Sequence, residues 1–256
     1  MSLPGAAGPW RRERSVTVGP VTMALTETAG LGDRVFVLVH GIGMGRAVFD
    51  DLAAALAATG RVLAFDLPGF GDSPEPGTAM SLETTAAVVA DAVAQQVCDG
   101  AIWVGHSMGT QIVAEAAVQR PELVRALVLI APTVDAAART APRQVWHMVR
   151  DLAGESPRVL AIGLWQYAKT SPVWFARKLR FMLAHHLERI TPRIAAPTLV
   201  LRGEHDRVCP APWTRQVAAS IPGARFAQIP GRGHEAVIKG AEPVADMIGE
   251  FVDALD

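Results

Sequence analysis

Short apolar runs alternate along most of the chain with stretches in which apolar positions recur every three to four residues. The short runs are rich in β-branched residues and indicate buried strands, whereas the longer spacing indicates helices. Strands are expected at residues 15–18, 21–28, 34–40, 62–65, 101–105, 126–130, 198–201 and 225–229. Helices are expected at residues 46–59, 82–97, 107–119, 211–220 and 241–254. Because nearly continuous apolar strands are buried on both faces, this alternation predicts a parallel sheet covered by helices.

The alternation breaks once, after Pro132, where residues 134–193 contain helical stretches and no strand pattern. We therefore predict one α/β domain, built on a mostly parallel twisted sheet of about eight strands with helices on both faces. A helical lid would be inserted after the sixth strand, at residues 134–193, between core segments 15–133 and 194–256. Residues 1–14, rich in Pro, Gly and then Arg, are expected to form a flexible N-terminal lead-in.

Composition and charge narrow the class of protein. The chain has 256 residues, 50% of them hydrophobic, which is enough for a substantial single core. Its formal net charge of −1 gives no overall field that would favour nucleic acid or a membrane surface. No apolar run approaches the ~20 residues of a membrane span, and the N-terminal residues lack the order of a signal peptide. We expect a cytoplasmic protein that acts on a small-molecule substrate and has neither a nucleic-acid partner nor a membrane span.

Residues 105–109, Gly-His-Ser-Met-Gly, lie between a predicted strand and a predicted helix. A G-x-S-x-G in this place predicts a nucleophile elbow, in which small residues permit a tight turn and the hydroxyl of Ser107 projects beyond the sheet. A serine hydroxyl needs a base and an orienting acid to become a nucleophile. Asp206 and His234 follow later predicted strands, so they would lie at the same edge of the sheet as Ser107.

Five motifs in this order resemble those of the α/β-hydrolase fold family, over residues 15–255. They are His-Gly-Ile-Gly at 40–43, D-x-P-G-x-G-x-S at 66–73, the elbow, Gly203-x-x-Asp206 and Gly233-His234. The resemblance implies that Ser107 attacks an acyl carbonyl, that His234 accepts its proton and that Asp206 orients the imidazole. It also implies that the backbone amides of Ile42 and Met108 form an oxyanion hole.

Other side chains compete for these roles. Glu204 is an alternative acid, although loop spacing favours Asp206. His205 is an alternative base but has no glycine-flanked loop to present it, and His106 lies inside the elbow, where its ring would point away from the serine hydroxyl.

Several neighbouring residues are expected to be structural. His40 is expected chiefly to hydrogen-bond loop backbone, and Asp66 and Ser73 to stabilise their turn. Cys98 and Cys209 are far apart in sequence and have no neighbouring thiol or metal set, so no disulfide framework, metal site or cofactor is predicted.

The predicted lid differs in charge and aromatic content from the rest of the chain. It holds ten Lys or Arg against four Asp or Glu, and three of the six tryptophans. One hypothesis is a hydrophobic pocket under a basic lid that favours an anionic substrate, lined by His40, Gly41, Trp146, Trp165 and Trp174. The alternative is that the tryptophans pack the lid on the core while the arginines form a solvated face.

The leading hypothesis is a serine hydrolase that cleaves carboxylic esters of small or medium substrates, anionic ones among them, through an acyl-serine intermediate. Alternatives on the same fold are hydrolysis of a C–C bond in vinylogous diketone acids, cleavage of an acyl thioester on a carrier, and cofactor-free perhydrolysis. Against the C–C reaction stands Glu235, where an aromatic residue would be expected. A non-catalytic receptor is the remaining alternative. Fold alone does not choose among these chemistries.

Overall fold

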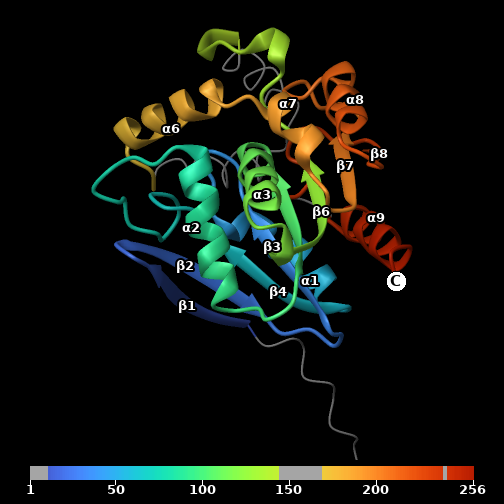
Figure 1. The fold of residues 1–256 in the computed structure, drawn as a ribbon, viewed down its shortest axis with the longest axis horizontal. Helices are drawn as coiled ribbons and strands as arrows, with labels where there is room; N and C mark the ends of the chain where they lie inside the picture. Colours follow the sequence, from blue (N-terminus) through green and yellow to red (C-terminus); the bar gives the residue numbers. More distant parts are fainter. Residues whose placement is uncertain (1–10, 144–168, 239–240) are drawn as a thin grey trace, which may run out of the picture.

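A single twisted sheet of eight strands forms the centre of the molecule (Figure 1). The computed structural model describes residues 11–143, 169–238 and 241–256. The strands are β1 (Arg11–Val18), β2 (Val21–Thr28), β3 (Arg34–Val39), β4 (Gly60–Phe65), β5 (Ala101–His106), β6 (Val124–Ile130), β7 (Thr198–Gly203) and β8 (Arg225–Ile229). Their spatial order is β1-β2-β4-β3-β5-β6-β7-β8. Strands β1 and β2 form an antiparallel hairpin, and β2 pairs antiparallel with β4. Strands β3 to β8 all run parallel to one another.

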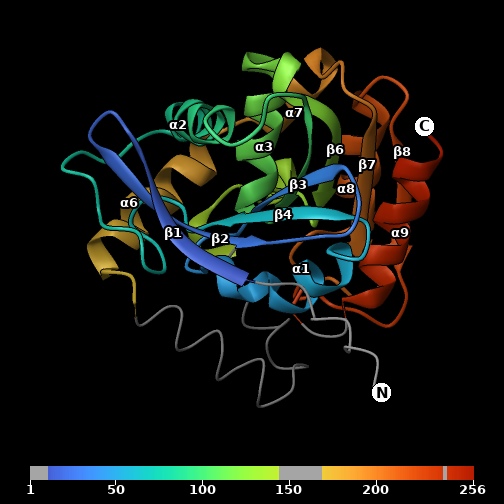
Figure 2. The ribbon, with the colours of Figure 1, turned by 90° about the horizontal axis from the view of Figure 1, so that it is seen from below.

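Helices cover both faces of this sheet (Figure 2). The described α-helices are α1 (Asp50–Leu56), α2 (Leu82–Ala94), α3 (Met108–Gln119), α6 (Pro172–Ala184), α7 (Leu187–Ile190), α8 (Ala211–Ser220) and α9 (Glu242–Asp253). Short 3₁₀ turns are η1 (Arg46–Phe49), η2 (Pro121–Leu123), η3 (Ala136–Ala138) and η4 (Thr191–Arg193). The predicted helix at 46–59 is therefore split into η1 and α1.

Two apolar cores arise because successive side chains of a strand point to opposite faces. In β3, Val37 and Val39 join the core under α2, α3 and α8, whereas Phe36 and Leu38 join the core under α1 and α9. The strands are therefore apolar on both sides, as the unbroken hydrophobic runs predicted. The predicted fold class is confirmed.

The N-terminal edge differs from the prediction. Strand β1 begins at Arg11, which pairs with Thr28 of β2, so residues 11–14 belong to the sheet and not to a lead-in of residues 1–14. The sequence pattern did not predict this start of the strand, because residues 11–14 are Arg-Arg-Glu-Arg and have no apolar alternation. An edge strand pairs through its backbone on one side only and commonly carries charged side chains.

Between β6 and β7 the described residues form helices and turns and no strand. Helix α6 packs against the core: the Trp174 indole lies against the turn at Gly69, and the Lys178 ammonium donates to Met80 O and Thr85 Oγ1 (both 3.0 Å). Residues 144–168 of the predicted lid, including Trp146 and Trp165, lie outside the described residues. Within the described part of the chain, no helix has the length and apolar character needed to cross a membrane.

Candidate active site

Ser107 is the single residue that connects the end of β5 to the start of α3. Its backbone is in a conformation that side-chain-bearing residues rarely adopt (φ 54°, ψ −121°), which is a strained turn of the kind found at functional sites. Flanking glycines permit this turn. A Cβ on Gly105 would lie 2.6 Å from Gly109 O, and a Cβ on Gly109 would lie 2.1 Å from Val39 O.

Three side chains that are distant in sequence meet at this turn. His234 Nε2 lies 3.1 Å from Ser107 Oγ, and His234 Nδ1 lies 3.0 Å from Asp206 Oδ2. All three are buried. With the proton on Nδ1, the imidazole donates to the carboxylate and presents the lone pair of Nε2 to the serine hydroxyl, which is the arrangement that general-base activation requires.

The environment of Asp206 keeps it ionised. Its second oxygen, Oδ1, accepts hydrogen bonds from the amides of Val208 and Cys209, both at 2.8 Å. Burial opposes ionisation, but the charge of His234 and these hydrogen bonds outweigh it and hold the pKa of Asp206 below its usual value.

His234 experiences the reciprocal effect. Burial disfavours the imidazolium, but the Asp206 carboxylate outweighs burial and raises the pKa of His234 well above 6.5. The pair therefore favours the imidazolium that forms when the serine proton is transferred.

The rival residues occupy other positions. Glu204 is exposed and its carboxylate accepts from the Gly231 amide at 2.9 Å, which supports the histidine loop from outside. His205 is exposed. His106 is buried, and its Nε2 donates to His234 O at 2.9 Å, so it contacts the backbone of the histidine loop. Burial lowers the pKa of His106 to about 3, which keeps this imidazole neutral.

The two residues predicted for the oxyanion hole lie in segments next to Ser107. Met108 is the first residue of α3, where backbone amides have no acceptor within the helix. The loop after β3 that carries Ile42 packs directly on the serine, since a Cβ on Gly41 would lie 3.0 Å from Ser107 Cβ.

Two of the residues predicted to line a substrate pocket are buried and hydrogen-bonded to backbone. His40 is fully buried with both ring nitrogens engaged: Nδ1 donates to Gly41 O (2.7 Å) and Nε2 accepts from the Leu67 amide (2.9 Å). Trp174 is also buried, and its indole N–H donates to Pro68 O at 3.2 Å. Trp174 thus packs α6 on the core, as the alternative interpretation of the aromatics expected.

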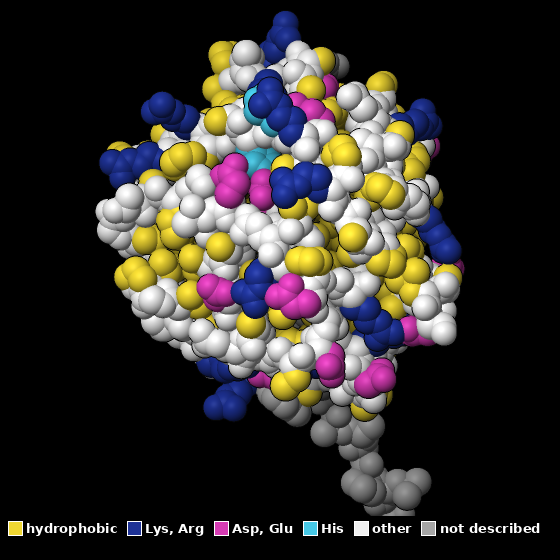
Figure 3. Space-filling view, viewed as in Figure 1, with side chains coloured by type: hydrophobic (Ala, Val, Ile, Leu, Met, Phe, Trp, Pro, Cys, Tyr) yellow, Lys and Arg dark blue, Asp and Glu magenta, His cyan; other side chains and the backbone are white. Residues whose placement is uncertain are grey.

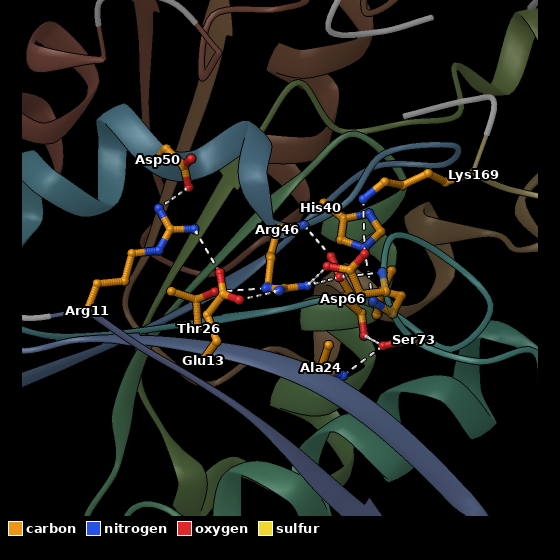
Figure 4. A network of polar contacts seen from close by, with 12 residues as sticks. Arg11, Glu13, Ala24, Thr26, His40, Arg46, Asp50, Asp66, Ser73 and Lys169 are labelled. Carbon is orange, nitrogen blue, oxygen red and sulfur yellow. Dashed lines mark hydrogen bonds and ion pairs between the residues drawn. The ribbon is translucent and has the colours of Figure 1, made fainter. Parts of the chain in front are cut away.

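Sequence reasoning missed the surroundings of two residues, Arg46 and Cys209. Arg46 is a buried arginine directly after the loop that carries Ile42, where an ordinary helix start was expected, and Figure 4 shows its contacts with Thr26 and Asp66. Cys209 is distant in sequence but its Sγ lies 4.0 Å from His234 Nδ1 and donates to Ala131 O. Burial raises the pKa of Cys209 to about 12, so the sulfur is a protonated thiol.

Some side chains that can bind metals are distant in sequence but close together in the structure. Among the described residues, two sets have ligand atoms within 4.8 Å of one another: Asp206, Cys209 and His234, and separately Glu83, Glu115 and His185. In the first set Asp206 and His234 hydrogen-bond each other, and in the second His185 Nε2 lies 2.9 Å from Glu115 Oε1.

Residues 36–247 match the alpha/beta hydrolase family. The chain belongs to this family. A similar relative is the pimeloyl-[acyl-carrier protein] methyl ester esterase of Xanthomonas campestris pv. campestris (strain B100), 31% identical over 248 residues that cover 86% of this chain and 95% of the relative. The protein of that name in Klebsiella pneumoniae subsp. pneumoniae is 38% identical over 135 residues, covering 53% of this chain and 47% of the relative.

Solved structures agree on the fold of this alpha/beta hydrolase. A bacterial membrane phospholipase A superposes with a TM-score of 0.80 at 25% identity, covering 96% of this chain and 86% of the other. A thermophilic esterase from Thermogutta terrifontis has a TM-score of 0.80 at 22% identity, covering 96% and 98%. The family and the hydrolase class predicted from the five motifs are confirmed.

Proposed function

We propose that this alpha/beta hydrolase is a serine esterase that cleaves carboxylic esters through an acyl-serine intermediate. Ser107 is the nucleophile, His234 the general base and acid, and Asp206 the residue that orients and stabilises His234. One observation carries the proposal: Ser107 Oγ, the His234 imidazole and the Asp206 carboxylate are joined by contacts of 3.1 and 3.0 Å at a strained strand-to-helix turn.

In the first half of the reaction, Ser107 Oγ attacks the ester carbonyl carbon while its proton moves to His234 Nε2. The carbonyl oxygen becomes an oxyanion, for which the amides of Ile42 and Met108 are the proposed donors. The tetrahedral intermediate collapses, the bond from carbon to the alcohol oxygen breaks, and His234 returns the proton to the leaving alcohol.

In the second half, a water molecule attacks the acyl-serine and gives its proton to the same nitrogen. The acid is released and the proton returns to Ser107. Asp206 stays ionised throughout and stabilises the imidazolium in both halves. The enzyme returns to its starting state, and the steps described use no cofactor.

The proposed substrates are esters of small or medium acyl chains with a small alcohol. The names of the Xanthomonas and Klebsiella relatives favour a methyl ester of an acyl chain on a carrier protein. Exposed arginines of the described lid residues support an anionic substrate of this kind: Arg177, Arg180, Arg189 and Arg193. Figure 3 shows several basic side chains at the end of the molecule where α6 and α7 lie, with a few acidic ones among them.

A fluorophosphonate probe and a substrate panel test the proposal. The folded protein should be labelled on Ser107, and labelling and turnover should both vanish in Ser107→Ala. The panel should hold p-nitrophenyl esters of graded length, methyl esters of free and carrier-bound acyl chains, acyl thioesters and dienoate acids. Ester turnover with the highest kcat/KM supports the proposal. Preferred cleavage of thioesters or of a C–C bond, or absence of labelling, would replace it with the corresponding alternative.

Salt dependence tests the anionic substrate separately. If the arginines attract substrate, kcat/KM for an anionic ester should exceed that of the matched neutral ester at low ionic strength, and the difference should shrink as salt screens the charges. Equal and salt-independent values would leave the arginines as solvated surface.

A further inference from the structure

Arg46 is a buried cation that directly follows the loop carrying Ile42, a proposed oxyanion donor, and Figure 4 shows its side chain pointing to Thr26 and Asp66. Its Nε donates to Thr26 Oγ1 at 2.7 Å, and its Nη1 donates to Asp66 Oδ2 and to Asp72 Oδ2, the latter at 2.9 Å. The backbone amide of Arg46 also donates to Asp66 Oδ1 at 2.5 Å. One side chain thus ties strand β2 and both carboxylates of the 66–73 turn to the residue that follows the oxyanion loop.

The loop from Gly41 to Gly45, which carries the Ile42 amide, is held at both ends against this turn. Before the loop, His40 Nε2 accepts from the Leu67 amide at 2.9 Å. After it, Arg46 engages Asp66 through both backbone and side chain. Within the loop, Gly43 has a φ of 72° and the Met44 amide donates to Gly41 O at 3.3 Å, so the loop is a closed turn whose position is set by the contacts at its two ends.

The turn that receives these anchors is itself fixed. Asp66 Oδ2 also accepts from the Asp72 amide (2.8 Å), and the Ser73 hydroxyl donates to Asp66 O while accepting from the Ala24 amide (both 2.8 Å). A Cβ on Gly71 would lie 2.4 Å from Asp66 Cγ, so the turn wraps closely around the carboxylate. Arg46 therefore binds to a turn that is itself held in place, so the turn would not move together with the loop if the loop shifted.

The loop also packs closely against Ser107, because a Cβ on Gly41 would lie 3.0 Å from Ser107 Cβ. A small shift of the loop changes the position of the Ile42 amide relative to the oxygen that becomes negative. Such donors act only at hydrogen-bonding distance from the oxyanion, so an error near 1 Å typically costs ~10²-fold in rate.

We infer that Arg46 is a positioning residue for ester hydrolysis: through the buried Arg46–Asp66 pair it holds the loop whose Ile42 amide stabilises the oxyanion. The inference rests on the proposed function, since it assigns this loop a role in the same reaction. Arg46 contacts no reacting atom. Its effect should therefore appear in stabilisation of the tetrahedral state and leave ground-state binding of the ester unchanged.

The test compares three variants with the wild-type enzyme. Arg46→Met removes the anchor, and Arg46→Lys keeps the charge but cannot reach Thr26, Asp66 and Asp72 together with one ammonium. The double variant Arg46→Met with Asp66→Asn removes both charges, so that no unpaired carboxylate is left buried if the single variant does not fold. Arg61→Met is the matched control, because Arg61 also pairs with a carboxylate, Glu27, but lies near the opposite end of β4 from the turn.

The readouts are kcat and KM per titrated active site, and the inhibition constant of a trifluoromethyl ketone that forms a tetrahedral adduct with Ser107. In the folded Arg46 variants kcat should fall about 10- to 100-fold with KM unchanged, and the inhibition constant should rise by the same factor. Arg61→Met should match the wild type.

A purely structural role would lower the melting temperature and the fraction of active sites without changing kcat per site or the inhibition constant. That result, or a change confined to KM, overturns the inference while leaving the esterase intact. Failure of the proposed function is seen separately, as wild-type protein that is neither labelled by fluorophosphonate nor active on esters.

Discussion

The closest packing around the proposed nucleophile is at Gly109, and the substitution Gly109→Ala probes it. The new Cβ would lie 2.1 Å from Val39 O and 2.9 Å from His40 O, whereas ordinary contacts begin at 3.4 Å. Both oxygens belong to the backbone at the end of β3, so no side chain can rotate away. Either the first turn of α3 or the end of β3 must move by roughly 1 Å.

Both of these segments carry parts of the site: α3 begins with Met108, and β3 leads into the loop of Ile42. We expect kcat/KM on a p-nitrophenyl ester to fall ~10²-fold, because a 1 Å misplacement of reacting groups typically costs that much. The free energy of unfolding should fall by about 1–3 kcal/mol, as is usual for overpacking. Urea unfolding and kinetics per titrated active site would measure the two effects.

Gly249→Ala is the matched control, because a Cβ there meets nothing within 4 Å and the residue lies inside helix α9. It should keep full activity and gain about 0.5–1 kcal/mol of stability from alanine's helix propensity. If Gly109→Ala behaved like this control, the close approach of α3 to β3 would not constrain the site and the reasoning would be refuted.

Further predictions concern the acid, the lid and a buried amine. Asp206→Asn should lower kcat ~10⁴-fold by favouring the wrong tautomer of His234. It should also move the acid limb of the kcat/KM profile to lower pH, because Asp206 is what raises the pKa of His234 and activity is lost as pH falls through that value; an unshifted limb would contradict this. Gly69→Ala would place a Cβ 2.2 Å from the Trp174 ring on a residue whose φ is 78°, so we expect a lower melting temperature, measured by calorimetry. Burial lowers the pKa of Lys178 to about 8 from 10.5. Between these values the unfolded chain binds more protons, so wild-type stability should rise by up to about 1.4 kcal/mol per pH unit relative to Lys178→Met in urea unfolding; parallel curves would disprove it.

The sequence determined the fold because its information is local and repeated. Unbroken apolar runs require burial on both faces, and helical segments between them require parallel strands. That periodicity was enough to predict a sheet of about eight strands, its helices and the break after the sixth strand. The glycines at 105 and 109 predicted the sharp turn at Ser107, since a tight turn leaves no room for Cβ atoms.

The motifs already paired Ser107 with His234 and favoured Asp206 over the neighbouring Glu204, but only the tertiary structure decided the contacts that join them. The distances depend on how loops 203–209 and 231–235 fold over the sheet edge. Arg46 and Cys209 had no local signal at all, because their partners lie on other strands and turns. Burial and long-range pairing are properties of the packed chain, and residue order records them only indirectly.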